Sequence, residues 1–380
     1  MKNLLCIGMM ALALFTTGGA FAGADEAEKQ PALSFYGGYK GDFVSNLNGG
    51  IKTGSTYLGL ADLFLELNTE NAGLWKGGTF MLHGANTHGG EPSADLIGDF
   101  QVVSNIEAGN HTFLYELWYC QTFGNFHTTI GLQDLNAEFA NSEFGGLFIN
   151  SSFGIHSIIA DNIAAPIFPL TSPGITICWE ATSRLNLKTA IYKGCPIDFD
   201  DNPYNLKWDL NYSDALLWVA EANFHCSADE DCAQLIKVGT FYHQHCEDET
   251  VSDDLESDYG FYVVGDHRVS PAKEYGKGLS VFYQLGVSPR NDNVGYIGTG
   301  IHYTGLFSQK GKDTFGLAMA KGVMNKDAGK DETTFELTYK LQLNDYIYFQ
   351  PDIQYVINPR GTDATLDNAL VGLFRLGLEF

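Results

Sequence analysis

The sequence predicts an all-β fold: a transmembrane antiparallel β-barrel of about 16 strands with a long loop folded inward. Three observations predict this class: a leader typical of export, many short segments in which apolar and polar residues alternate, and a closing segment that ends on an aromatic residue. In that segment Leu376, Leu378 and Phe380 alternate with Arg375 and Glu379. A period of two with one polar side indicates a strand with one apolar face. We expect Phe380 to end the closing strand of the barrel.

The leader predicts the location. Lys2 precedes an apolar run over 4–15 and then a small-residue site at Ala20, Phe21 and Ala22. This order is typical of a secretory signal peptide, and the run is shorter than the roughly 20 residues that a spanning helix needs. We therefore expect residues 1–22 to be a signal peptide and residues 23–380 to form one porin-like barrel domain, a multi-pass β-barrel in the bacterial outer membrane.

The charge of the chain excludes one class of function, and its cysteines predict a disulfide. The chain carries 46 Asp and Glu against 22 Lys and Arg, a net charge of −24, which excludes non-specific nucleic-acid binding. We interpret most of the acidic residues as part of solvated outer loops. Cys226 and Cys232 bracket a short acidic turn and are the predicted disulfide, with a weaker expectation for Cys195 with Cys246. The remaining pairing, which also involves the two cysteines at 120 and 178, stays open.

Period-two alternation divides the mature chain into sixteen expected strands. The clearest is 333–343, in which Phe335, Leu337 and Tyr339 oppose Glu336 and Lys340. The expected strands are 33–43, 56–68, 78–88, 112–123, 126–134, 174–181, 184–193, 216–225, 233–243, 259–267, 278–287, 295–305, 314–322, 333–343, 346–356 and 368–380. The even number and the alternation of short and long connections agree with a bacterial barrel that has short periplasmic turns and longer outer loops.

One connection, 135–173, shows no regular alternation of apolar and polar residues and is too long for an ordinary loop. Such a length in a compact domain indicates a functional loop, and in a pore its use is to fold inward and narrow the lumen. We place the short apolar piece 100–103 inside a different outer loop, because a full strand there would break the even strand number.

Several segments, taken in order along most of the mature chain, resemble the carbohydrate-selective porins of the OprB family. Segments that carry the resemblance include Tyr57-Leu58-Gly59, Ala72-Gly73-Leu74-Trp75-Lys76-Gly77-Gly78, Gly131-Leu132-Gln133-Asp134-Leu135-Asn136, Pro166-Ile167-Phe168-Pro169 and Gln350-Pro351-Asp352-Ile353-Gln354. The resemblance implies a sixteen-stranded outer-membrane barrel that passes mono- or oligosaccharides by diffusion, with no enzymatic activity and no cofactor. The sequence departs from the family pattern in the cysteine-rich, acidic region 178–246.

Successive side chains of a strand point alternately into the lumen and outward, and we call the side on which a residue falls its parity. Parity predicts which side chains line the path of a solute through the lumen. A sugar pore needs hydrogen-bonding and charged groups beside aromatic faces at a narrow point. The candidates are the strand residues Asp62, Glu66, Glu116, Trp118, Arg184, Lys188, Glu336, Lys340 and Arg375 and the loop residues Asp134, Asn136 and Glu138. The alternative for each of them is a cross-strand charge ladder that stiffens the wall. In the strand of Trp118, the opposite, apolar face is expected to carry Phe113, Tyr115, Leu117 and Tyr119.

Other functions were weighed. His243, His245 and Cys246 have metal-ligand chemistry, but no second cluster at ligand spacing accompanies them, and no local motif marks a hydrolase triad, so no metal site and no catalytic residue are predicted. The alternatives to a sugar pore are a general, cation-biased porin and a structural or adhesive outer-membrane protein with a plugged barrel. Expected partners are outer-membrane lipid and, through Phe380, the barrel-assembly machinery; the sugar and the oligomeric state stay open.

Overall fold

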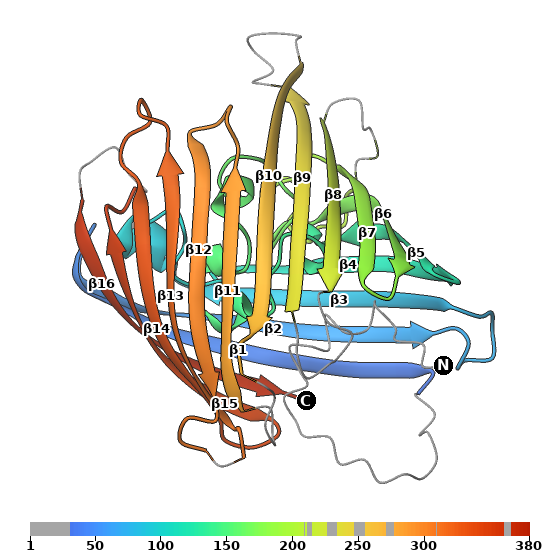
Figure 1. The fold of residues 1–380 in the computed structure, drawn as a ribbon, viewed down its shortest axis with the longest axis horizontal. Helices are drawn as coiled ribbons and strands as arrows, with labels where there is room; N and C mark the ends of the chain where they lie inside the picture. The colour runs from blue at the N-terminus through green and yellow to red at the C-terminus, as the bar shows by residue number, and fades with distance from the viewer. Residues whose placement is uncertain are drawn as a thin grey trace.

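The computed structural model describes residues 31–208, 210, 215–225, 234–246, 255–270, 277–308, 310–360 and 366–380. Sixteen antiparallel strands form one closed ring in which each strand pairs with its sequence neighbours and β1 pairs with β16 (Figure 1). The strands are β1 (Leu33–Gly50), β2 (Gly54–Asn68), β3 (Gly78–Gly89), β4 (His111–Phe123), β5 (Phe126–Gln133), β6 (Ser172–Thr182), β7 (Leu185–Lys193), β8 (Ala215–His225), β9 (Gln234–Cys246), β10 (Leu255–Arg268), β11 (Gly278–Val287), β12 (Asn293–Thr304), β13 (Asp313–Met324), β14 (Glu332–Gln342), β15 (Ile347–Ile357) and β16 (Asp367–Glu379). The predicted fold class and strand number are confirmed. No helix in these described residues is long and apolar enough to cross a membrane.

Alternation decides which side chains face outward. On β14, Phe335 and Leu337 are 44% and 40% exposed, whereas Glu336 between them is fully buried. On β16, Phe374, Leu376 and Leu378 are exposed and Arg375 is buried. The outer surface is therefore an apolar belt, as a barrel that faces lipid requires, and the polar face of each strand points into the lumen.

The seam joins the two ends of the chain. β1 pairs with β16 from Gly38 and Glu379 to Gly50 and Asp367, with two register shifts near Asn48. Beyond the paired strands, the amide of Gly37 donates to the carbonyl of Phe380 at 2.9 Å, and the amide of Phe380 donates back at 3.0 Å. The last residue of the chain thus takes part in closing the ring.

A β-bulge in β4 overturns part of the predicted parity. His83 of β3 lies opposite Glu116, but the next residue, Gly84, lies opposite Leu114, so one extra residue is inserted at Tyr115. The inserted residue turns Phe113 and Tyr115 toward the lumen, where they are 3% and 6% exposed. The prediction that these two rings share the outer face with Leu117 was wrong, because a bulge shifts the period by one residue.

Three predicted boundaries also differ. Arg184 lies in the turn between β6 and β7 and is exposed, so it is not part of the wall. Asp134 follows β5 and is the N-cap of the short helix α2 (Leu135–Glu138), because its side chain accepts a hydrogen bond from the amide of Asn136. β1 continues to Gly50, through a Gly/Asn-rich stretch that was expected to be a loop.

Two long loops enter the ring of strands, seen as the teal and green segments inside it in Figure 1. The first, between β3 and β4, contains the π-helix η1 (Ser93–Ile97) and the segment 100–103, which is not a strand, as predicted. The second, between β5 and β6, contains α2, η2 (Gly145–Leu147), η3 (Ser151–Phe153) and α3 (Ser157–Ala160). We call them the β3–β4 loop and the β5–β6 loop. The sequence predicted only the second.

Candidate functional site

The first part of the lumen site is an acid–imidazole–acid group on adjacent strands. His83 of β3 lies between two carboxylates, with Nε2 2.8 Å from Oδ1 of Asp62 on β2 and Nδ1 3.4 Å from Oε2 of Glu116 on β4. The neighbouring strands bring these residues together because their side chains have the same inward parity. Both carboxylate side chains keep 15% exposure, so they stay in contact with the aqueous lumen.

Aromatic rings run beside these carboxylates. Phe64 stacks on His83 with centroids 3.9 Å apart, and Tyr36 of β1 stacks on Phe64 at 4.8 Å. On the other side, Tyr115 meets the edge of His83 at 4.9 Å. The four rings form a continuous row across β1–β4, which we call the aromatic row. Glu66 lies on the same inward face of β2, two residues from Phe64.

The aromatic row leads to the base of the β5–β6 loop. Tyr115 donates its hydroxyl to Oδ2 of Asp134 at 2.7 Å, and Trp118 donates its indole N–H to Glu116 at 3.3 Å. Burial, with a smaller contribution from the charge of Glu116, raises the pKa of Asp134 to about 7. The amide of Asp134 also donates to Oε1 of Glu116 at 3.4 Å, so Glu116 contacts the residue at which the loop begins.

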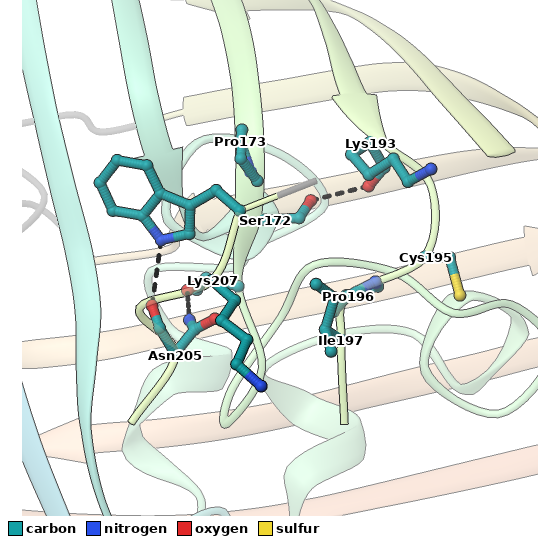
Figure 2. Close-up of a pocket in the computed structure, with 10 residues that line it drawn as sticks. Ser172, Pro173, Lys193, Cys195, Pro196, Ile197, Asn205 and Lys207 are labelled. Atoms are coloured by element: carbon teal, nitrogen blue, oxygen red, sulfur yellow. Dashed lines mark hydrogen bonds between the residues drawn. The ribbon is translucent and has the colours of Figure 1, made fainter. Parts of the chain in front are cut away.

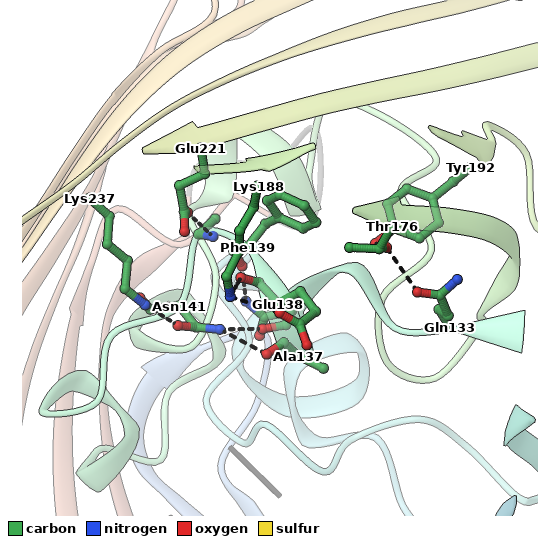
Figure 3. Close-up of polar contacts among 12 residues, drawn as sticks. Gln133, Ala137, Glu138, Phe139, Asn141, Thr176, Lys188, Tyr192, Glu221 and Lys237 are labelled. Carbon is green, nitrogen blue, oxygen red and sulfur yellow. Dashed lines mark hydrogen bonds and ion pairs between the residues drawn. The ribbon is translucent and has the colours of Figure 1, made fainter. Parts of the chain in front are cut away.

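Wall side chains anchor the first half of the β5–β6 loop, as Figure 3 shows. The ammonium of Lys188 is 2.7 Å from Oε2 of Glu138 and also donates to that residue's carbonyl at 3.2 Å. Glu221 of β8 accepts the amide of Ala140 at 2.9 Å, and Lys237 of β9 donates to the side chain and carbonyl of Asn141. These charge-assisted bonds fix the backbone of the loop to β7–β9.

Carboxylates on later strands anchor the rest of the inward segments in the same way. Asp266 of β10 accepts the hydroxyl of Ser142 at 2.5 Å and the amides of Glu143 and Phe144 at 3.1 and 3.2 Å. Glu336 of β14 accepts the amides that follow, from Ile149 at 2.6 Å and Asn150 at 3.0 Å. On the same strand, the side chain of Glu332 accepts two amides of the β3–β4 loop, at residues 100 and 101.

Apolar contacts complete the docking of the β5–β6 loop. Its Phe139, Phe148 and Phe153 are at most 2% exposed and belong to one cluster with wall residues such as Tyr262 and Phe282. That cluster spans β7–β13, and a second cluster packs the β3–β4 loop against β1–β4, β15 and β16. The loops are therefore packed like a soluble core. Tyr115 of the aromatic row is buried in the second cluster, whereas Tyr36, Phe64 and the carboxylates of Asp62 and Glu116 stay partly exposed.

Of two other predicted residues, Arg375 is engaged with the β3–β4 loop and the seam, and Lys340 contacts a ring of β15. Arg375 makes a bidentate pair with the fully buried Asp42, both distances being 2.7 Å, and donates to Asn105 at 2.8 Å. Asp42 also accepts the hydroxyl of Ser104 at 2.7 Å. The ammonium of Lys340 lies 4.1 Å from the centre of the Tyr348 ring.

The structure thus separates the predicted residues into groups. Asp62, Glu116, Trp118 and Asp134 come together around His83; Glu138 pairs with Lys188; Glu336 and Arg375 hold loops. Asn136 bonds within its own loop, to the carbonyls of residues 139 and 154, and Arg184 lies away from these groups in its turn. The sequence reasoning missed the aromatic row and the anchors, namely Tyr36, His83, Asp42, Glu221, Lys237 and Asp266. An aromatic residue on the polar side of a strand, as at Phe64, was the available signal for the row.

The cysteine predictions have mixed outcomes. Cys226 and Cys232 lie outside the described residues, so their disulfide stays a prediction that non-reducing mass spectrometry can check. Cys195 is an exposed free thiol, so the weaker expectation that it pairs with Cys246 is wrong for this structure. Cys120 and Cys178 are buried free thiols. Of the residues considered for a metal, His243 donates its Nε2 proton to the carbonyl of Gly194, 2.6 Å away, and no group of three possible ligands occurs within the described part of the chain.

A closed sixteen-stranded barrel with an apolar outer belt and with loops packed inside a polar lumen defines an outer-membrane porin. The model of the carbohydrate-selective porins matches residues 52–231 and 230–380, and the chain belongs to this OprB family. Its function is therefore the passive, carbohydrate-selective diffusion of small sugars across the outer membrane.

Individual relatives agree with this assignment. Porin B of Pseudomonas aeruginosa is 23% identical over 414 residues, which cover 90% of this chain and 86% of the relative. The fold is similar to the high-pH structure of OprB from Pseudomonas putida, with a TM-score of 0.79, 20% identity and coverage of 92% and 94%. The low-pH structure of the same protein has a TM-score of 0.59 at 17% identity, covering 92% and 93%.

Proposed function

We propose that sugars cross this porin along the aromatic row and its carboxylates, with the β5–β6 loop as the filter. The single observation that carries the proposal is the stack of Tyr36, Phe64 and His83 beside Asp62 and Glu116. A sugar ring has apolar C–H faces and equatorial hydroxyls. Aromatic faces bind the former, and carboxylates that keep access to water accept hydrogen bonds from the latter.

The remaining candidates have different expected roles in the path. Glu66 and Trp118 supply an acceptor and a ring near the row, and Lys340 supplies a donor on the other side of the seam. Lys188, Glu138, Glu336 and Arg375 act indirectly, because their charges hold the loops rather than face the space between them. The acidic groups at the row favour small cations over anions.

We also infer the steps around transport. Residues 1–22 direct export and residues 23–380 insert as the barrel, with the apolar belt in contact with outer-membrane lipid and Phe380 used in assembly. The mature chain acts as a channel and not as an enzyme, since passage of a sugar requires no covalent bond to be made or broken.

Liposome swelling tests the path. Liposomes with the purified porin should swell faster in glucose or maltose than in an amino acid of similar size at equal osmolarity. Phe64→Ala should reduce this preference several-fold, because it removes the central ring of the row. Phe43→Ala is the matched control, since Phe43 is a 48% exposed ring on the outer face of β1 and should leave the preference unchanged.

Two results would contradict the proposal. If Phe64→Ala kept the sugar preference, the aromatic row would not be the path. If the unmodified porin gave no swelling in any solute, a plugged, structural barrel would replace the pore.

A further inference from the structure

Two lysines on either side of the seam face the lumen without a counterion. Lys40 of β1 has the inward parity of Asp42, two residues along the same strand, and Lys340 of β14 has that of Glu336. Both lysines are half-buried. Neither makes a hydrogen bond or an ion pair with any residue that the structure describes, whereas Arg375 on β16 between them is bound to Asp42. We call these two residues the lysine pair.

Lysines elsewhere in the barrel show the difference. In the lumen, the ammonium of Lys188 is paired with Glu138. In the cleft beside β6 and β7 (Figure 2), Lys207 donates to the carbonyl of Asp201 at 2.6 Å and Lys193 is only 6% exposed. The lysine pair differs from these residues because its ammonium protons stay available for a partner outside the chain.

One aromatic ring connects the two lysines. Tyr348 of β15 is opposite Gly377 of β16, and Gly377 is in turn opposite Lys40. A Cβ atom on Gly377 would lie 2.0 Å from the Tyr348 ring, so the ring occupies the space that a side chain at this position would take. The ammonium of Lys340 is 4.1 Å from the centre of the same ring. The ring thus extends from Lys340 across β16 toward Lys40.

The ring positions Lys340 without neutralising it. A ring face attracts an ammonium group but carries no net charge, so the positive charge remains available to a ligand. Glu379 of β16 is two residues from Gly377 and shares its inward parity, and its charge acts on Lys340 together with that of Lys40. Glu379 forms no ion pair with either lysine in the described structure. Two ammonium groups and one carboxylate therefore leave this corner of the lumen with one net positive charge.

The lysine pair lies at the end of the barrel away from the connections that fold inward. The β3–β4 and β5–β6 loops connect odd-numbered to even-numbered strands, whereas the turn between Lys340 and Tyr348 connects β14 to β15 and is at the other end. The aromatic row reaches the same region, because Tyr36 is four residues before Lys40 on the inward face of β1. A solute that passes the loops along the row therefore meets the lysine pair beside it.

We propose that the lysine pair binds the carboxylate of a sugar acid such as glucuronate. The carboxylate accepts hydrogen bonds from both ammonium groups, and Glu379 accepts hydroxyls of the sugar ring. The composition of the site favours a singly charged sugar, because a neutral sugar leaves both ammonium charges unused and a doubly charged phosphate exceeds the one net positive charge. This substrate class goes beyond the neutral sugars of the aromatic row, and the inference rests on the proposed function only in that solutes pass close to β1.

Block of the ion current in planar bilayers by glucuronate, glucose and acetate tests the proposal. Half-block should need at least about fivefold less glucuronate than glucose or acetate, because only glucuronate offers both a carboxylate and hydroxyls. The double variant K40Q/K340Q should lower the preference for glucuronate over glucose at least about fivefold, because it removes both charges. The matched control K326Q/K330Q removes two exposed lysines of the β13–β14 connection and should keep the preference of the parent.

Two results would overturn the proposal. An unchanged preference in K40Q/K340Q would mean that glucuronate binds elsewhere, and equal block by acetate and glucuronate would mean that the site recognises any small anion. The two proposals fail separately, since Phe64→Ala reports on the neutral-sugar path and K40Q/K340Q on the charge-dependent preference. If K40Q/K340Q failed to fold, as judged by heat modifiability on gels, K40Q alone would decide: Lys40 has no hydrogen bond or ion pair with the described residues, and its loss should still lower the preference at least about twofold.

Discussion

Replacing Asp266 by Ala should release the middle of the β5–β6 loop without unfolding the barrel. Asp266 accepts three hydrogen bonds from consecutive loop residues, at 2.5, 3.1 and 3.2 Å, and two of the donors are the backbone amides of Glu143 and Phe144. A hydrogen bond to a charged group contributes about 1.5–3 kcal/mol, so losing the two amide bonds alone costs about 3 kcal/mol at the lower end. Since each 1.4 kcal/mol is a factor of ten, local opening becomes roughly 100-fold more frequent.

Hydrogen–deuterium exchange measures this opening directly. The amides of Glu143 and Phe144 should exchange roughly 100-fold faster in Asp266→Ala, and single-channel recordings should show more flicker, because a loosened loop moves within the conducting space. The apolar cluster under the loop is unchanged, so the melting temperature should fall much less than the local protection does.

Asp313→Ala is the matched control. Asp313 of β13 also accepts two backbone amides, from Phe307 at 2.9 Å and Ser308 at 2.7 Å, but these belong to the short β12–β13 connection and not to the β5–β6 loop. This variant should speed exchange at 307–308 and leave 143–144 protected. Exchange at 143–144 that rises less than threefold in Asp266→Ala would refute the anchoring argument.

Three further predictions concern the path, its charge and assembly. Trp118→Ala should weaken sugar block of the ion current several-fold with little change in open conductance, as measured in planar bilayers; an equal loss of both would indicate a collapsed lumen. The pKa of Asp134, raised by burial to about 7, lies above its unfolded value, so the protonated form is favoured in the fold and negative charge appears as pH rises through 7. Cation preference should therefore increase between pH 5.5 and 8.5, and reversal potentials of Asp134→Asn should lose that increase; a parent pore without it would contradict the prediction. Deleting Phe380 removes the two backbone hydrogen bonds to Gly37 at the seam and should reduce outer-membrane insertion, visible as less heat-modifiable protein in membrane fractions, while normal insertion would count against a role at closure.

Alternation predicted most of the wall because burial on one face imposes a period of two on every strand. It failed where the backbone leaves that period: the bulge at Tyr115 turned two rings inward, and Arg184 fell into a turn. The predicted pore residues were mostly of the right parity, but parity cannot tell a side chain that faces water from one that holds a loop. Glu336 is an example: its side chain points inward, as predicted, but it is fully buried and accepts an amide of the loop. Only tertiary contacts with the loops separate these roles.

The prediction that residues 135–173 fold inward rested on the length of this segment and on its lack of alternation. The β3–β4 loop was missed because its apolar residues are scattered. Ile97, Val103 and Ile106 have no regular spacing, yet each is at most 2% exposed in the fold. Their order comes from contacts with strands at both ends of the chain, such as Val356 and Val371, which no local pattern encodes.

The anchoring of the inward loops by carboxylates changes how charge in this protein should be counted. Glu221, Asp266, Glu332 and Glu336 direct their charge at backbone amides, and Asp42 is neutralised by Arg375. Five of the 46 acidic side chains are thus bound to loop amides or to Arg375, so the count of acidic residues overstates how many carboxylates face the lumen. On the proposed path, the carboxylates beside His83 keep access to water, so we expect substitutions there to change ion preference more than substitutions of the anchoring carboxylates. Loop sequence and ion selectivity can thus change independently of the overall acidity of the chain.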